Sequence, residues 1–171
     1  IYGMAVDLGS TTIAAHLCDL RTGDVVASSG QMNPQIRFGE DLMSRVSYAM
    51  MNPGGDKEMT SAVRDGMDAL FTQISADAEI DKTLIMDAVF VCNPVMHHLF
   101  LGIDPFELGQ APFALATSNA LRLFAHQLDI NIHPSARVYI LPCIAGHVGA
   151  DAAAVALSEA PDKSDDLVLV V

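Results

Sequence analysis

The sequence predicts an α/β domain on a mixed sheet, with three antiparallel strands followed by helices that alternate with single strands. Two observations carry this prediction. Short apolar and β-branched runs separated by turn residues occupy 2–6, 12–17 and 25–32. After Asn33-Pro34 the apolar residues change to helical spacing, and compact apolar runs return at 88–92 and 138–141. The first pattern is typical of an antiparallel meander, and the second is typical of alternating helices and strands.

The remaining elements follow from spacing and capping residues. Helices are expected over residues 42–50, 57–78, 94–101, 119–128 and 150–159. Residues 103–119, with two prolines, are expected to form an irregular surface excursion. Residues 161–166 look like a polar connector, and 167–171 look like a buried strand. A mixed sheet with helices on both faces is the ribonuclease-H-like arrangement.

Composition excludes several kinds of partner. The 171 residues carry a net charge of −12 with scattered basic residues, which predicts no nucleic-acid binding. No apolar run reaches the roughly 18 residues that a membrane span requires. Cys18, Cys92 and Cys143 lie far apart and form no ligand ladder, so we expect reduced thiols and a cytoplasmic protein.

The segment Asp7-Leu8-Gly9-Ser10-Thr11-Thr12 is the most informative motif. A carboxylate at a strand end can hold Mg²⁺ through waters, because this ion gives up its hydration shell reluctantly. A glycine lets the backbone approach a ligand, and amides and hydroxyls can donate to phosphate oxygens. Taken alone, the same six residues are equally compatible with an ordinary hairpin turn.

The position of this segment favours the phosphate-binding interpretation. It joins the first two strands of the meander, and the chain ends in a helix rich in small residues and a new strand. This arrangement resembles the superfamily of sugar kinases, heat-shock chaperones and actin, in which the first phosphate loop lies between strands one and two. The resemblance implies that 1–166 is the first lobe of an actin-like ATPase domain, and that 167–171 begins the first strand of a second lobe.

Three further segments resemble a narrower family. They are Asn33-Pro34-Gln35-Ile36-Arg37-Phe38-Gly39-Glu40-Asp41-Leu42-Met43-Ser44-Arg45, Cys92-Asn93-Pro94-Val95-Met96-His97-His98-Leu99-Phe100-Leu101-Gly102 and Leu141-Pro142-Cys143-Ile144-Ala145-Gly146. With the first motif they resemble the reductive activators of corrinoid-dependent methyltransferases and corrinoid proteins, although Cys92 and Pro94 replace the glycine and threonine usual there. The family implies ATP-assisted return of cobalt(II) corrinoid to cobalt(I), with a corrinoid protein or methyltransferase as partner. It also implies electrons from an iron–sulfur region outside this chain.

The resemblance also implies a set of site residues. ATP phosphates would be held by Gly9, Ser10, Thr11 and Thr12, with Gly146 and Gly149 of the segment before the connecting helix. Asp7 would hold Mg²⁺ and act in catalysis with Asp151. Asp151 is equally interpretable as a first-turn acid that complements the helix dipole.

Two other groups in the matching segments have open roles. Arg37, Asp41 and Arg45 fall at four-residue spacing, which predicts either a place at the cleft or partner surface, or a surface ion pair. Adjacent His97 and His98 would diverge by about 100° on a helix, which disfavours a shared metal and favours helix-end histidines.

Two alternative functions stay open at this stage. One is a small-molecule kinase of the same fold, which would need a general base near the acceptor hydroxyl. The other is a nucleotide-binding assembly module without turnover. For the chain by itself we expect no activity, and a possible homodimer through the exposed strand at 167–171.

Overall fold

The computed structural model describes residues 1–160 and Lys163. The strand predicted at 167–171 lies outside the described residues, as does the connector at 161–166 apart from Lys163. The expected boundary after residue 166 and the homodimer through the last strand therefore stay predictions.

Six strands form one mixed sheet. They are β1 (Tyr2–Leu8), β2 (Thr12–Asp19), β3 (Val25–Met32), β4 (Ile85–Cys92), β5 (Leu121–Phe124) and β6 (Arg137–Ile140). Their order across the sheet is β3-β2-β1-β4-β6-β5. The pairs β1–β2, β2–β3 and β5–β6 are antiparallel, whereas β1–β4 and β4–β6 are parallel. The predicted meander and mixed sheet are confirmed.

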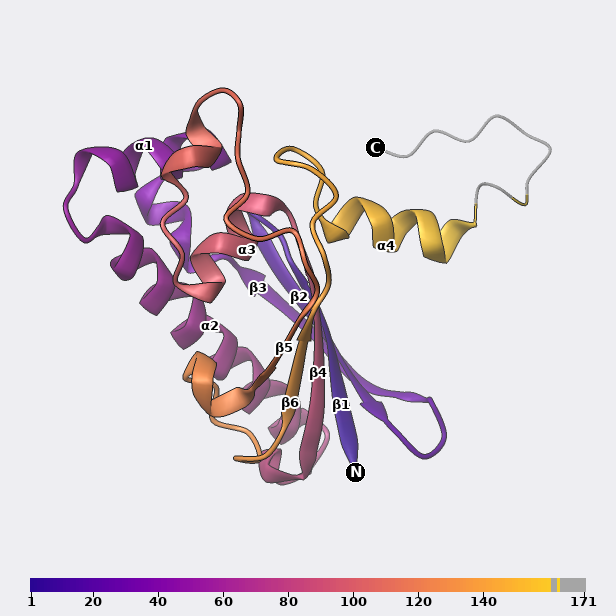
Figure 1. Cartoon of the computed structure of the whole chain (residues 1–171). Coiled ribbons are helices and arrows are strands. Elements are labelled where there is room, and N and C mark those ends of the chain that lie inside the picture. Colours follow the sequence, from indigo (N-terminus) through magenta and orange to yellow (C-terminus); the bar gives the residue numbers. More distant parts are fainter. Residues whose placement is uncertain (161–162, 164–171) are drawn as a thin grey trace.

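Helices lie on both faces of this sheet. They are α1 (Leu42–Met51), α2 (Gly55–Asp77), α3 (Pro94–Leu101) and α4 (Ala150–Glu159), with short 3₁₀ helices at Pro34–Phe38, Lys82–Leu84, Phe106–Gly109 and Ala125–Leu128. Figure 1 shows α1, α2 and α3 on one side of the sheet and α4 on the other. Within the described residues, no helix is both long enough and apolar enough to cross a membrane.

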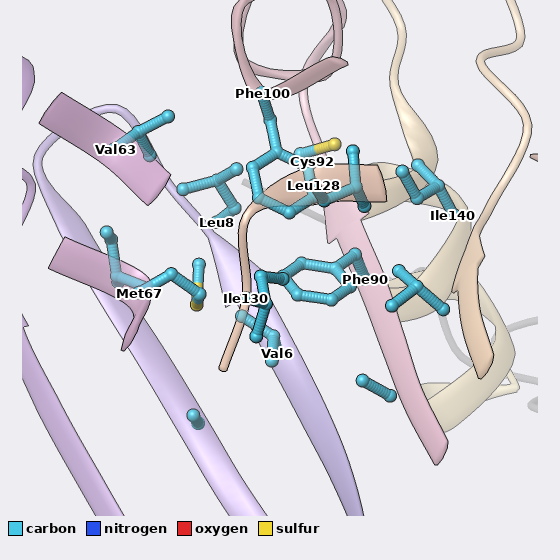
Figure 2. Packing of buried hydrophobic residues seen from close by; sticks show 14 of the residues in the cluster. Val6, Leu8, Val63, Met67, Phe90, Cys92, Phe100, Leu128, Ile130 and Ile140 are labelled. Atoms are coloured by element: carbon cyan, nitrogen blue, oxygen red, sulfur yellow. The ribbon is translucent and has the colours of Figure 1, made fainter. Parts of the chain in front are cut away.

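The core fills the side of the sheet that α2 and α3 cover. Alternate residues of β1 point into it, because successive strand side chains face opposite ways, and Val6 and Leu8 are both buried. Phe90 of β4 stacks on Phe100 of α3 with ring centroids 4.7 Å apart. Figure 2 shows these side chains in one cluster with Val63 and Met67 of α2. The core therefore fixes which residues of β1 face the opposite side, and Asp7 is one of them.

The helix predicted over residues 119–128 is wrong. This stretch forms strand β5 and then the 3₁₀ helix Ala125–Leu128. Leu121 and Leu123 are more buried than the residues that follow each of them, a period of two, and β5 pairs antiparallel with β6. Pairing with a neighbouring strand outweighed a weak local helical signal in so short a segment.

Candidate phosphate-binding hairpin

The Asp7–Thr12 motif forms a tight hairpin at the carboxyl end of β1, the strand between β2 and β4 in the sheet. The Gly9 amide donates to the Thr12 carbonyl at 3.0 Å, which closes the turn. A Cβ atom at Gly9 would lie 2.6 Å from that same carbonyl oxygen. The turn therefore requires glycine at this position because the two backbone segments approach too closely for a side chain.

Each of the four carbonyls in the turn Gly9–Thr12 accepts a hydrogen bond from another group of the protein. The Asn33 side-chain amide donates to the Gly9 carbonyl at 2.8 Å, and the Asn33 backbone amide donates to the Thr11 carbonyl at 2.8 Å. The Arg45 guanidinium donates to the Ser10 carbonyl through Nη2. The fourth carbonyl, that of Thr12, accepts from Gly9, so the orientation of each peptide in the turn is fixed.

The orientation of these peptides decides where the amides point. In a trans peptide the carbonyl and the next N–H point in opposite directions. Holding the Gly9 and Ser10 carbonyls inward therefore turns the amides of Ser10 and Thr11 outward. Neither amide has a hydrogen-bond partner among the described residues. With the side chains of Thr11 and Thr12 exposed, the hairpin presents donors to an anion.

The two arginines and the aspartate of the second segment have separate roles. Asp41 caps α1, accepting from the Ser44 amide at 2.8 Å and the Ser44 hydroxyl at 2.7 Å, which lower the pKa of its carboxyl. The Arg37 guanidinium lies 4.7 Å from the centre of the Phe38 ring. Arg45 is fully buried. The surface-ion-pair interpretation is wrong for Arg45, because this side chain turns inward beneath the hairpin.

Asp7 and Asp151 line one cavity of about 500 Å³ between α4 and the sheet face opposite the core. The rest of its lining is mainly apolar, with Ala5, Val89 and Val155 among the residues. The pKa of Asp7 is raised, first because burial removes the carboxylate partly from water and second because Asp151 carries like charge. The structure thus brings together the two carboxylates that the sequence singled out.

These carboxylates suit a hydrated Mg²⁺ better than a cation held by protein ligands alone. A cation near Asp7 would relieve the repulsion from Asp151. Among the described residues, however, no group of three or more His, Cys, Asp or Glu side chains could hold a metal ion. Mg²⁺ tolerates such a site, since it keeps several waters and commonly adds phosphate oxygens to one or two carboxylates.

The glycines ahead of α4 allow close backbone packing. A Cβ atom at Gly149 would lie 2.3 Å from the Cys92 carbonyl oxygen and 2.6 Å from the Asn93 Cα. Cys92 is paired with Leu8 at the end of β1, so Gly149 brings the start of α4 close to the hairpin. At Gly146 a Cβ atom would lie 2.1 Å from the Phe113 carbonyl, which places this glycine against the surface excursion.

The adjacent histidines of α3 lie inside the protein. Both are almost completely buried, and their Nδ1 atoms are 3.4 Å apart. The Ala116 amide donates to His98 Nε2 at 3.0 Å, so the proton lies on Nδ1 and is donated to the Pro94 carbonyl at 2.9 Å. His98 thereby ties the surface excursion to α3. His97 Nε2 has no partner among the described residues.

The histidine pair makes stability depend on pH. Burial lowers the pKa of His97 to about 4, with His98 adding to the shift, and burial also lowers the pKa of His98. In the unfolded chain these histidines take up protons near pH 6.5, whereas in the folded protein they stay neutral until the pH approaches their lowered pKa values. We therefore expect the free energy of unfolding to decrease as the pH is lowered from 7 to 5, by up to about 1.4 kcal/mol per pH unit for each histidine.

Urea unfolding across this pH range measures the effect. His97→Leu removes one of the two groups and should flatten the slope, whereas His126→Gln, at an exposed histidine, should leave it unchanged. An unchanged slope in His97→Leu would show that this residue is not the source.

The sequence alone did not identify the buried residues that support the inner side of the hairpin, directly or through Asn33 and Arg45. Asn33, Gln35 and Met96 are all fully or almost fully buried, and the Met96 sulfur accepts from Asn33 at 3.4 Å and from Arg45 at 3.3 Å. The Asn-Pro dipeptide is a sequence signal that could have identified Asn33. Asn33-Pro34 and Asn93-Pro94 each open a helix, with the asparagine side chain bonding a backbone amide of the first turn.

Comparison with known proteins supplies the family. The family model described as the RACo middle region matches residues 2–164. The corrinoid activation enzyme RamQ of Eubacterium limosum is 34% identical over 169 residues, which are 99% of this chain and 28% of that protein. A solved structure described as a reductive activator for corrinoid, iron-sulfur protein superposes with a TM-score of 0.93 at 34% identity, covering 98% of this chain and 27% of that chain. The chain thus spans little more than a quarter of the length of these relatives, and it belongs to the RACo middle region family.

Proposed function

We propose that this chain is the ATP-binding lobe of a protein that reductively reactivates corrinoids. The observation that carries the proposal is the hairpin whose carbonyls are all held inward, so that the Ser10 and Thr11 amides face outward. Phosphate oxygens of ATP would accept from these amides and from the hydroxyls of Ser10, Thr11 and Thr12. Gly149 supports the site indirectly, by letting α4 approach the end of β4.

The carboxylates beside the hairpin would hold Mg²⁺ with the nucleotide. Asp7 is the principal candidate, and Asp151 on the same cavity would orient a coordinated water. Mg²⁺ held by these carboxylates would supply positive charge to balance that of the phosphates. Asp7 and Asp151 repel each other without such a cation, which is consistent with the raised pKa of Asp7.

The proposed reaction of the whole protein is the return of cobalt(II) corrinoid to cobalt(I) for methyl transfer. The electron would come from an iron–sulfur region outside this chain, and the partner would be a corrinoid protein or a corrinoid-dependent methyltransferase. The printed names of the relatives, a corrinoid activation enzyme and a reductive activator for a corrinoid, iron-sulfur protein, support this partner class. ATP binding would favour the conformation in which electron transfer occurs.

The test is Mg·ATP binding by the full-length protein, followed by corrinoid reduction. We expect ATP to bind in a Mg²⁺-dependent manner, and to raise the rate at which the cobalt(II) absorbance of a corrinoid protein disappears when a low-potential reductant is present. ATP-independent reduction at the same rate would contradict the proposal. Phosphate transfer to a sugar or a small carboxylic acid, instead of corrinoid reduction, would favour a kinase of this fold.

A further inference from the structure

Arg45 is a buried cation surrounded by neutral acceptors. Its Nε donates to the Gly39 carbonyl at 2.9 Å, and its Nη1 lies 3.3 Å from both Gln35 Oε1 and the Met96 sulfur. Its Nη2 donates to the Ser10 carbonyl. None of these four acceptors carries a charge, and no carboxylate forms a salt bridge with Arg45 among the described residues.

The Asp41 carboxylate, at the N-cap of α1, attracts Arg45 electrostatically but forms no salt bridge with it among the described residues. Both oxygens of Asp41 accept from Ser44 at the start of α1. A fully buried charge without a directly bonded counter-ion is costly, and proteins normally pair such a charge or bind an ion against it. Arg64, which is only partly buried, does have a carboxylate partner, because it pairs with the exposed Asp129 at 2.8 Å.

The hydrogen bond to Ser10 directs the effect of this charge. The Ser10 carbonyl and the Thr11 amide belong to the same peptide, and that amide points away from the protein. A charged donor on the carbonyl polarises the peptide and strengthens its N–H as a donor, since hydrogen bonds in series reinforce one another at low dielectric. The positive potential of Arg45 thus reaches the surface at the Thr11 amide.

We infer that Arg45 is a positioning residue for phosphate, and that the anion bound on the other side of the Ser10–Thr11 peptide serves as a counter-ion for its charge. The inference rests on the proposed function, since it assigns the origin of the affinity of that site for phosphate. It identifies no contact between Arg45 and the ligand. Arg45 acts through one peptide group, and its charge and its hydrogen bond both contribute.

Three variants of the full-length protein separate charge from structure, with Mg·ATP and adenosine as probes. Arg45→Gln keeps hydrogen-bonding capacity but removes the charge, and should weaken Mg·ATP binding by about tenfold, equivalent to 1.4 kcal/mol. Arg45→Lys keeps the charge and should bind within about threefold of the parent. Arg64→Gln removes a partly buried arginine that also donates to a backbone carbonyl, that of Phe100, and should change affinity less than about twofold.

Adenosine distinguishes positioning of phosphate from general damage. A purely structural defect would weaken adenosine and Mg·ATP alike, whereas loss of the Arg45 charge should leave adenosine affinity unchanged. Parallel losses for both ligands, or parent-like Mg·ATP affinity in Arg45→Gln, would overturn the inference while leaving the proposed function intact. A parent protein that does not bind Mg·ATP would overturn both.

A measurement on the unsubstituted protein covers the case in which Arg45→Gln does not fold. The Nε–H signal of Arg45 in arginine-labelled protein, assigned through the Arg45→Lys spectrum, should move when Mg·ATP saturates the site and stay in place with adenosine. An unmoved signal at saturating Mg·ATP would contradict the inference.

Discussion

Replacing Asp7 by asparagine is expected to abolish the Mg²⁺ dependence of ATP binding while leaving the protein at least as stable as the parent. Asparagine is nearly the same size, so the cavity beside α4 keeps its shape. It carries no charge, so it cannot balance Mg²⁺. We expect Mg·ATP affinity to fall at least tenfold, or about 1.4 kcal/mol, and ATP-stimulated corrinoid reduction to be lost.

The stability half of this prediction follows from the sign of the pKa shift. Burial and Asp151 raise the pKa of Asp7 above its unfolded value. The stabilising contribution of this group is complete below the unfolded pKa, and it is lost as pH rises through the raised folded value. Above the folded pKa the carboxylate is charged in both states, and the folded protein bears the repulsion that asparagine removes.

Calorimetric titration with and without Mg²⁺, together with thermal unfolding, measures both halves. Asp87→Asn is the matched control, because Asp87 lies on β4 opposite Gly3, toward the other end of the same sheet. It should keep the parent's affinity. If Asp7→Asn bound Mg·ATP as the parent does, Asp7 would not be the magnesium ligand.

The second large effect is expected for Gly149→Ala. The added methyl would meet two backbone atoms, the Cys92 carbonyl oxygen at 2.3 Å and the Asn93 Cα at 2.6 Å. Neither atom can rotate away as a side chain could, so α4 or the end of β4 must shift. We expect a loss of about 1–3 kcal/mol in the free energy of unfolding, and a loss of Mg·ATP affinity because Asp151 moves with the helix.

Ala153→Gly is the control for this variant. It weakens α4 by about 1 kcal/mol through helix propensity, without touching the contact at the start of the helix. If both variants lost affinity equally, helix stability rather than the position of Asp151 would explain the result. If Gly149→Ala kept full affinity in a nucleotide titration, the close packing would be irrelevant to the site.

Long periodic elements and capped ends could be predicted from the sequence. The α4 prediction of 150–159 matches its bounds, and the buried face of α2 follows the helical spacing of Val63, Met67 and Ile74. In α2 the same residues that set the local period also make the tertiary contacts. The helix prediction for residues 119–128 was wrong because β5 has only four residues, and its partner β6 lies beyond them in the chain.

The candidate site could be predicted only on its outer side. Asp7 and Asp151 are visible as carboxylates at the ends of elements, and the structure places both on one cavity. The inner side depends on acceptors that sequence spacing does not reveal. Arg45 is charged and lies on a helix, a combination that usually indicates exposure, and its burial depends on two carbonyls outside that helix, those of Gly39 and Ser10.

The carbonyl contacts beneath the hairpin also bear on transplantation of the motif. Moving Asp7–Thr12 into an unrelated β-hairpin would transfer the carboxylate, the glycine and the hydroxyls. It would leave behind Asn33 and Arg45, which hold the turn in its orientation. In a foreign host the peptides of the turn would be free to rotate, and the amides would lose their common direction. The functional unit is therefore discontinuous in sequence, and a scaffold designed to bind phosphate in this way needs both parts.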